Sequence, residues 1–389
     1  MSKACLALAL LVAGCGSSDS QPGGNAGNGG GGTGGSAGGS TGGSGGITTG
    51  CNASVVLLDK DADPEKTGPA PVGARTVQLG KLTVEVWYPA PAGSDQGKTP
   101  KTYDLRSWLP ESEKTKIPDA DNPWQSSASF PDLPLDTEHG PYPAIVFVHG
   151  TAGFRTQSLH HMEHWASRGF VVLAADHPGL YLGDMLDFQL QRDLPADLDA
   201  LVSALAVPAG NLAFLSGHVD ATHLGMVGHS AGGGAITNRG NDARVLIPIA
   251  AGGTQAGSSL ESTLVMGGQA DKVVDYANTV TGYEGSPPKK RLVGLAKAGH
   301  LFPSGLCWLE NSKGENILEV AQKYQVKNAT LAGALFDCPA DQLSEADARA
   351  IVDYATSAAL EEALECKQGD PFADLSTRFP AVAELRHDP

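Results

Sequence analysis

The residue of this sequence that most clearly could do chemistry is a serine with a glycine two positions before it and another two positions after it. Residues 228–232 read Gly-His-Ser-Ala-Gly, between the apolar run 223–227 and a segment expected to be helical. A Gly-x-Ser-x-Gly sequence between a strand and a helix is typical of a sharp turn that exposes the serine hydroxyl. Because a hydroxyl is a weak nucleophile until a base removes its proton, Ser230 requires a base nearby.

Candidates for an acid and a base follow Ser230 in the chain. Asp271 and His300 each come directly after an apolar run and a short loop, which is where a strand would deliver them to a sheet edge. The order serine, acid, histidine is the order that this kind of site requires. Asp275 is the alternative acid, but we expect it within the next helix, and His387 is the alternative base, close to the last residue. We predict Ser230 as nucleophile, Asp271 as acid and His300 as base.

Attack by Ser230 on a carbonyl would create an oxyanion that needs N–H donors. We expect the backbone N–H of Ala231 as one donor. The other should be that of Thr151, in the loop after the apolar run 144–148, with Ala152 as the alternative. His229 is a candidate pocket residue that we expect to pack beneath the turn. Further candidates for an apolar pocket, if they are not core residues, are Phe154, Leu180, Tyr181, Phe302 and Trp308.

Three segments resemble a known family. The sequences that begin at His149 (HGTAGFRT), Trp165 (WASRGFVV) and Gly228 (GHSAGG) resemble bacterial relatives of platelet-activating-factor acetylhydrolase and secreted cutinase-like polyester hydrolases. The resemblance covers residues 75–370 and implies the α/β-hydrolase fold. It also implies a serine carboxylester hydrolase that forms an acyl-enzyme from short-chain, lipid-type or polyester esters, small or polymeric.

The resemblance implies the triad Ser230, Asp271 and His300, with oxyanion amides at Thr151 and Ala231. The sequence departs from the polyester hydrolases in its long 91–141 segment, in its cysteine-bearing tail, and in having Ala231 where they commonly carry Met. These departures leave the substrate open while the reaction type stands.

Two other functions would use the same residues. A serine peptidase of this fold has the same triad but would be expected to bring a propeller or helical cap domain, which the sequence does not indicate. An inactive, surface-tethered binding protein is the third possibility, against which the complete triad counts. We expect no cofactor and no metal. His160 and His164 lie one helical turn apart, but they lack a third ligand and are interpreted as a solvated helix face.

Strands alternating with helices must position these residues. Continuous apolar runs indicate strands that are buried on both faces, and they occur at 144–148, 170–175, 223–227, 245–249, 262–266 and 291–296. Helical spacing occurs between them and in a closing helix at 344–365. This alternation predicts an α/β fold with a mostly parallel central sheet flanked by helices. Residues 72–90 predict an antiparallel pair. The proline-rich segment 91–141 either covers the site or packs outside the sheet.

The N-terminal fifty residues cannot form part of a core. Residues 1–15 read as a bacterial lipoprotein signal peptide with a lipobox, and we expect Cys15 to be lipidated. Residues 16–50 are rich in Gly and Ser and predict a flexible linker. The catalytic domain would span 51–389, including the 91–141 insertion and a cysteine-containing helical segment at 301–389. The expected location is outside the cytoplasm, anchored to the outer membrane or cell surface by lipid, or secreted.

The net charge bears on the possible binding partners, and the cysteines bear on disulfide formation. The net charge of −16 over 389 residues excludes the basic surface that nucleic acids require, and we expect a monomer. Apart from Cys5 and Cys15, the sequence holds four cysteines, an even number that favours two disulfides in an exported protein. Sequence does not determine their connectivity. Our guess is Cys307 with Cys338 and Cys51 with Cys366.

Overall fold

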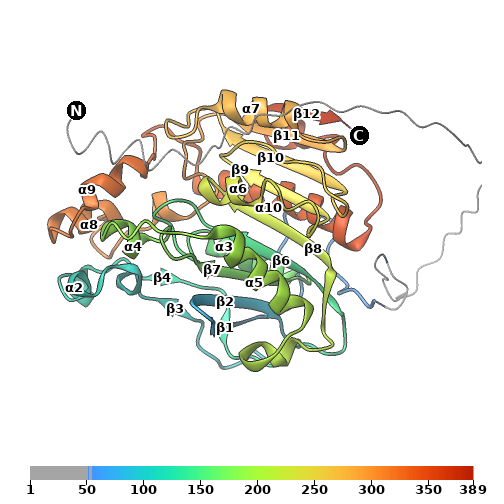
Figure 1. The fold of residues 1–389 in the computed structure, drawn as a ribbon, viewed down its shortest axis with the longest axis horizontal. Coiled ribbons are helices and arrows are strands. Elements are labelled where there is room, and N and C mark those ends of the chain that lie inside the picture. The colour runs from blue at the N-terminus through green and yellow to red at the C-terminus, as the bar shows by residue number, and fades with distance from the viewer. Residues whose placement is uncertain (1–50, 52–54, 389) are drawn as a thin grey trace, which may run out of the picture.

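The computed structural model describes residue 51 and residues 55–388, and within them a ten-stranded mixed sheet forms the centre (Figure 1). The strand order is β12-β11-β10-β9-β8-β6-β7-β2-β1-β5. Strands β6 to β11 are parallel where they pair, whereas β1, β2 and β12 run antiparallel to their neighbours β2, β7 and β11. The strands are β1 (Val72–Leu79), β2 (Leu82–Pro89), β5 (Phe130–Pro131), β6 (Tyr142–Val148), β7 (Val171–Asp176), β8 (Val219–His229), β9 (Val245–Ile249), β10 (Ser262–Gly268), β11 (Lys290–Leu295) and β12 (Val382–Asp388).

The predicted α/β fold with a mostly parallel sheet is confirmed. Strands β6 and β10 are buried along their whole length, as their continuous apolar runs predict. The antiparallel pair predicted at 72–90 is β1 and β2. Strand β12 was not predicted, because its residues are half exposed and carry several charges.

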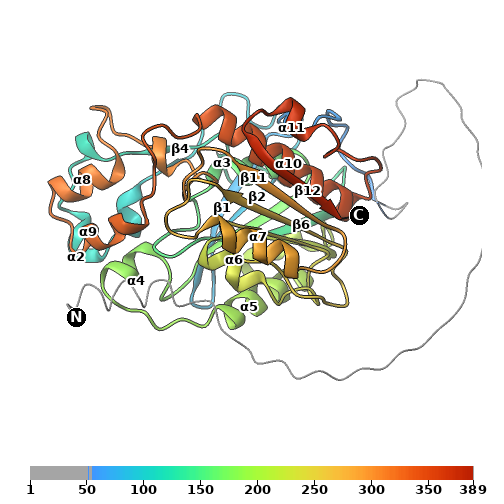
Figure 2. The same ribbon diagram turned by 90° about the horizontal axis from the view of Figure 1, so that it is seen from above.

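Helices cover both faces of the sheet, as Figure 2 shows. On one face α3 (Leu159–Ser167) packs on β2 and β7, and α10 (Glu345–Glu365) packs on β8, β9 and β10 in the largest core cluster. On the other face lie α5 (Leu194–Ala206), α6 (Ala231–Ile236) and α7 (Tyr276–Gly285). The side chain of Ser344 caps α10 by accepting the N–H of Asp347, where the sequence predicted this helix to begin. Among the described residues, no helix combines the length and apolar character needed to cross a bilayer.

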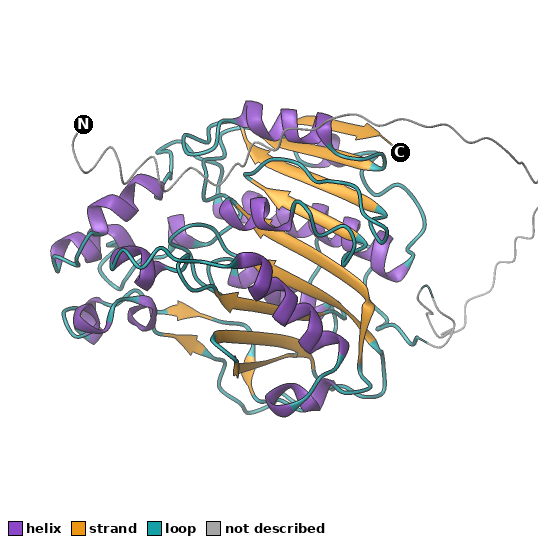
Figure 3. Cartoon of the chain, viewed as in Figure 1, coloured by secondary structure: helices purple, strands orange, loops and turns teal. Residues whose placement is uncertain are grey.

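Two segments that are far apart in the sequence gather beyond one end of the sheet. We call residues 104–123 and 306–336 together the cap; in Figures 1 and 3 its helices lie at the left, beside α4 (Leu182–Leu186). Its elements are η1 (Leu105–Trp108), α2 (Glu111–Lys114), η2 (Asp119–Asp121), η4 (Leu306–Trp308), α8 (Ile317–Lys323), α9 (Ala329–Ala332) and η5 (Gly333–Leu335). A small sheet of β3 (Thr102–Tyr103) and β4 (Gln125–Ser126) forms the base of the first segment.

Polar contacts join the two cap segments. The Asp121 carboxylate accepts from Lys323 Nζ at 2.7 Å and from the Tyr324 hydroxyl at 2.6 Å, and it also pairs with Lys313. Glu113 accepts the backbone N–H of Lys327 at 2.8 Å. Beneath these contacts lies a separate apolar cluster shared by both segments and α4, with Ile117, Leu186, Val320, Val326 and Ala329 at its centre. The cap is therefore a packed unit with a small core of its own.

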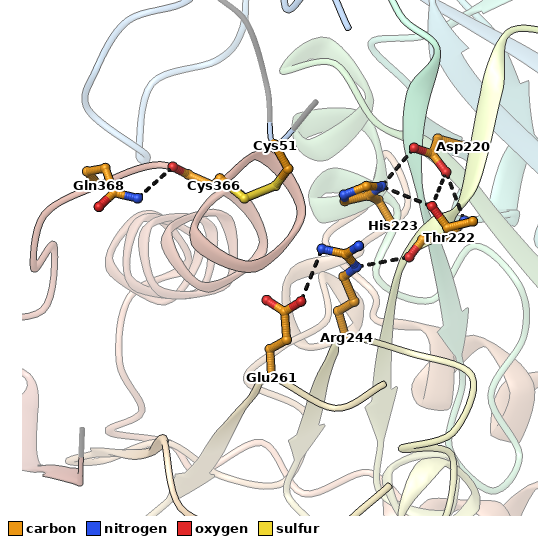
Figure 4. Close-up of a disulfide and its surroundings, with 8 residues drawn as sticks. All are labelled: Cys51, Asp220, Thr222, His223, Arg244, Glu261, Cys366 and Gln368. Atoms are coloured by element: carbon orange, nitrogen blue, oxygen red, sulfur yellow. Dashed lines mark hydrogen bonds and ion pairs between the residues drawn. A yellow bond between two sulfur atoms is a disulfide. The ribbon is translucent and has the colours of Figure 1, made fainter. Parts of the chain in front are cut away.

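Two disulfides close the chain. Cys51 is bonded to Cys366, which directly follows α10, so the start of the described domain is tied to the end of its longest helix (Figure 4). Cys307 is bonded to Cys338 across the second cap segment. Both pairs are those expected from the sequence. Disulfides persist in oxidising compartments, which agrees with export from the cytoplasm.

Candidate active site

Ser230 occupies a strained turn between β8 and α6. Its φ of 56° and ψ of −120° lie in a region that non-glycine residues rarely adopt. The turn is crowded on both sides. A Cβ atom on Gly228 would lie 2.4 Å from the Gly232 carbonyl oxygen, and one on Gly232 would lie 2.1 Å from that of Val148. The glycines on either side of the serine are thus required by close backbone packing.

The side chains of Ser230, His300 and Asp271 are linked by two hydrogen bonds. His300 Nε2 is 2.9 Å from Ser230 Oγ, and His300 Nδ1 is 2.8 Å from Asp271 Oδ2. The other carboxylate oxygen of Asp271 accepts the backbone N–H groups of Val273 and Val274, both at 2.8 Å. These bonds hold the carboxylate in one orientation, so that it accepts from His300 with a fixed geometry.

The alternative acid and base lie elsewhere. Asp275 is the N-cap of α7, where its side chain accepts the N–H of Ala277, so it stands just before that helix rather than within it. His387 lies on β12, 3.8 Å from Asp370. Neither competes for the position beside Ser230.

The expected oxyanion donors stand on both sides of the serine. Ala231 is the first residue of α6, so its N–H has no carbonyl one turn before it to bond. The alternative donor Ala152 is wrong, because its N–H is donated to the Leu180 carbonyl oxygen at 2.9 Å. Within residues 55–388 the Thr151 N–H donates to no backbone or side-chain acceptor. Thr151 and Ala231 therefore remain the predicted pair.

A chain of hydrogen bonds beneath the Ser230 turn, here called the relay, connects that turn to the loops at residues 150 and 300. The Gly150 N–H donates to Gln157 Oε1 at 3.3 Å, and Gln157 Nε2 lies 2.7 Å from His229 Nδ1. His229 Nε2 lies 2.9 Å from the His300 carbonyl oxygen. Burial lowers the pKa of His229 to about 3, so this imidazole is neutral. The sequence analysis did not single out Gln157, whose position in a polar turn carries no signal of this role.

A second carboxylate supports the loops that carry Asp271 and His300. Asp337 Oδ2 accepts the backbone N–H of Lys272 at 2.9 Å and that of His300 at 3.0 Å. Lys272 directly follows Asp271, so one oxygen atom bridges the two loops. The sequence analysis missed Asp337, although it stands beside Cys338 in the tail that distinguishes this chain.

Comparison with known proteins gives one family match and a similar solved structure. Residues 130–306 match the family model described as PETase, PET hydrolase-like. The structure of a ferulic acid esterase from Streptomyces cinnamoneus superposes with a TM-score of 0.54 at 17% identity, covering 84% of this chain and 98% of that chain. At that identity the likeness shows the fold.

The chain has the α/β-hydrolase fold. The family match also confirms the expected class, an ester-hydrolysing enzyme, and the shared fold agrees with it. Neither cap segment lies within the matched residues except for the first position of the second segment, residue 306.

Beside Ser230 the protein has a cleft of about 1070 Å³, measured with its opening to solvent. The loop 150–154, Ser230 and His300 line its floor, and the cap and α4 form its walls. Both alternatives left open for the segment 91–141 hold in part, because its residues Phe130–Pro131 form the edge strand β5 of the sheet. Its residues 105–123 lie over the site.

The predicted pocket residues are only partly correct. Phe154 and His229 line the cleft. Leu180, Tyr181, Phe302 and Trp308 do not: Leu180 is fully buried, Phe302 belongs to the main core, and Tyr181 packs against that core. The walls are instead formed by residues without a sequence motif, among them Leu109, Ile117, Leu182, Val320 and Ala332.

The histidines of α3 are not a solvated face, contrary to the sequence interpretation. His161 and His164 are buried against α10. His160 Nε2 and His161 Nδ1 lie 2.8 and 2.6 Å from the two carboxylate oxygens of Asp353. Among the described residues, no group of three or more His, Cys, Asp or Glu side chains has the arrangement of a metal site. These histidines attach α3 to α10.

Proposed function

We propose that this protein is a serine carboxylester hydrolase that works through an acyl-enzyme on Ser230. The observation that carries the proposal is the continuous line from Asp271 through His300 to Ser230 Oγ at the floor of a cleft, with bonds of 2.8 and 2.9 Å. Such a line activates a hydroxyl for attack on a carbonyl carbon.

The geometry supports a two-step reaction. His300 donates from Nδ1 to Asp271, which leaves the lone pair of Nε2 facing the serine hydroxyl. As Ser230 Oγ bonds to the carbonyl carbon, Nε2 takes its proton, and the carbonyl electron pair moves to the oxyanion. When the oxyanion collapses, the carbon–oxygen bond to the alcohol breaks and His300 returns the proton to that alcohol. Water then attacks the acyl-enzyme by the same steps and releases the acid and free Ser230.

The backbone supports the oxyanion. The N–H of Ala231 and that of Thr151 would each donate to it, and one such donor contributes about 3–4 kcal/mol to transition-state stabilisation. Both amides belong to segments fixed by packing: Ala231 to the start of α6, and Thr151 to the loop whose Gly150 N–H is held by Gln157. A donor that is already in place costs no reorganisation during the reaction.

Labelling with a fluorophosphonate probe tests the nucleophile. The wild-type protein should be labelled and should hydrolyse p-nitrophenyl acetate, whereas Ser230→Ala should lose both. Ser216→Ala, a change at an exposed serine, is the matched control and should behave as wild type. Labelling that survives in Ser230→Ala would overturn the proposal. A panel of peptide amides beside the ester tests the peptidase alternative, and we expect turnover of the ester only.

We also propose that the domain is held at a membrane through lipid on Cys15, a residue outside the described part of the chain. The two disulfides support export, because they require an oxidising compartment. Metabolic labelling with a fatty-acid analogue in a bacterial host should mark the wild-type chain and not Cys15→Ser. Equal labelling of both proteins would refute the anchor.

A further inference from the structure

We propose that the cleft binds the uncharged aliphatic chain of a small, soluble ester, so that the cap selects substrates by hydrocarbon length. This inference rests on the proposed function and narrows its substrate. The cleft is lined mainly by aliphatic side chains, which outnumber its two phenylalanines, Phe154 and Phe336. A flexible hydrocarbon can follow walls of this kind, and each methylene removed from water is stabilised by about 0.8 kcal/mol.

The cleft offers no free cation to an anionic substrate. Arg106 is the one Lys or Arg among its lining residues, all of which the structure describes. Its guanidinium is occupied: it donates from Nε and Nη2 to Asp104 at 2.7 to 3.1 Å, and from Nη1 to the Ile117 carbonyl oxygen at 2.9 Å. Nη1 also pairs with Asp119 at 2.7 Å. A carboxylate or phosphate on the substrate would have to displace these partners, so an uncharged chain is favoured.

The cap also distinguishes this chain from the matched family, which is described as PET hydrolase-like. The family model covers residues 130–306, whereas the walls at 105–123 and 317–336 lie outside it. The two segments are joined through Asp121 and Glu113, so the cleft has walls on two sides above Ser230. A free ester can enter such a space end-on, while a chain fixed in a solid polymer cannot.

The acyl-length profile of the wild-type enzyme tests the inference directly. With p-nitrophenyl acetate, butyrate, hexanoate and octanoate, kcat/KM should rise by about fourfold per added methylene until the cleft is filled. Dispersed aliphatic polyester particles and vesicles of anionic phospholipid should release little acid in comparison. A flat or falling profile, or preferred turnover of the particles or vesicles, would overturn it. Acetate hydrolysis by wild type shows in the same assay that the proposed function itself holds.

A pair of alanines provides the matched variants. Ala332 on α9 lines the cleft, whereas Ala334 in η5 is exposed and does not. Ala332→Phe should lower the ratio of octanoate to acetate kcat/KM at least tenfold by filling the cleft, and Ala334→Phe should leave it unchanged. Fluorophosphonate labelling confirms that each variant is folded. An unchanged ratio in Ala332→Phe contradicts the inference, and Ala321→Leu on α8 repeats the test at another wall.

We further infer from separate contacts that Asp337 is a positioning residue for the triad. Its Oδ2 bridges the backbone of Lys272 and His300 at 2.9 and 3.0 Å. The segment around it lies against the loop of the base, since a Cβ on Gly299 would come within 2.7 Å of the Asp337 carbonyl oxygen and 2.4 Å of Pro339. The neighbouring Cys338 is fixed to Cys307. Asp337 thus sets the spacing of acid and base without touching the substrate.

Substitution of Asp337 should change kcat more than KM. We expect Asp337→Ala to lower kcat for p-nitrophenyl acetate by about tenfold or more, because small displacements of catalytic groups are costly, with KM within about twofold. Asp337→Asn retains an acceptor oxygen and should restore kcat to within about threefold of wild type. Asp341→Ala, at an exposed carboxylate nearby, is the control. A wild-type kcat in Asp337→Ala, or equal losses in the Ala and Asn variants, would overturn this role.

Discussion

His229 Nε2 lies 2.9 Å from the backbone carbonyl oxygen of His300. A carbonyl oxygen only accepts, so Nε2 carries the proton, and Nδ1 of the neutral ring accepts from Gln157. His229, the residue before Ser230, therefore holds His300, the proposed base. His300 is fixed at its carbonyl by His229 and at its N–H by Asp337.

Removal of the His229 imidazole should impair the chemical step. We expect His229→Ala to lower kcat for p-nitrophenyl acetate by about tenfold to a hundredfold, because the loops at 150 and 300 lose their common partner. Steady-state kinetics and the rate of fluorophosphonate labelling should fall together. His139→Ala changes a partly exposed histidine that pairs with Asp136 and should leave both rates intact. Equal rates in the two variants would refute the relay.

The two glycines Gly232 and Gly234 should respond oppositely to alanine. A Cβ on Gly232 would lie 2.1 Å from the Val148 carbonyl oxygen, whereas one on Gly234 meets nothing within 4 Å. Gly232→Ala should lower the free energy of unfolding by about 2 kcal/mol or more and abolish activity. Gly234→Ala should raise it by about 0.5–1 kcal/mol, since alanine is favoured within a helix. Urea denaturation measures both, and similar effects at the two sites would contradict the packing at the turn.

Loss of the Cys307–Cys338 disulfide should affect activity as well as stability. The bond closes a loop of 31 residues, for which chain entropy predicts a contribution of roughly 3–4 kcal/mol. Because Asp337 precedes Cys338, the double variant Cys307→Ser, Cys338→Ser should also show a lower kcat. The double variant Cys51→Ser, Cys366→Ser should lose stability and retain kcat. If kcat were instead retained without the Cys307–Cys338 bond and lost without the Cys51–Cys366 bond, Asp337 would be held by other contacts.

The protein should lose stability on mild acidification. Burial lowers the pKa of both His149 and His229 from 6.5 to about 3. Below pH 6.5 the unfolded chain therefore binds protons that the folded protein does not, and the stabilisation present above pH 6.5 is lost progressively as the pH falls towards 3. Urea denaturation at pH 7 and pH 5 should show a decrease of roughly 2 kcal/mol per histidine. His149→Gln should show a smaller pH dependence, and an unchanged one would mean that His149 does not contribute.

Asp121 should hold the two cap segments together. Hydrogen bonds from Lys313, Lys323 and Tyr324 hold the pKa of Asp121 well below its usual range, so its charge persists at any pH that the enzyme would meet. Asp121→Ala should lower kcat/KM for p-nitrophenyl octanoate more than for the acetate, by about threefold or more, because only the longer chain uses the cap walls. Glu111→Ala, which removes an exposed ion pair with Lys114, should not change that ratio. A proportional loss on both esters would argue against control by the cap.

Local patterns in the sequence were sufficient to predict that Ser230, Asp271 and His300 meet. The turn at Ser230 needs a strand, two glycines and a helix within a few residues, and Asp271 and His300 each follow their own buried strand. Parallel strands deliver their last residues to one edge, so chain order and strand context predict that the three side chains meet. The same local reasoning predicted the closing helix, because a helix start such as Ser344 depends on neighbours within one turn.

Only the tertiary structure decided what surrounds these three side chains. Glu113 and Lys327 meet although 214 residues separate them, and His161 is buried by Asp353, 192 residues away. Apolar periodicity shows that a residue is buried but not which segment covers it, so the walls of the cleft and the histidines of α3 could not be predicted. By itself the sequence determined which three side chains meet at the edge of the sheet, because strand context and chain order place them there. Contacts between distant segments decided the space that a substrate can occupy.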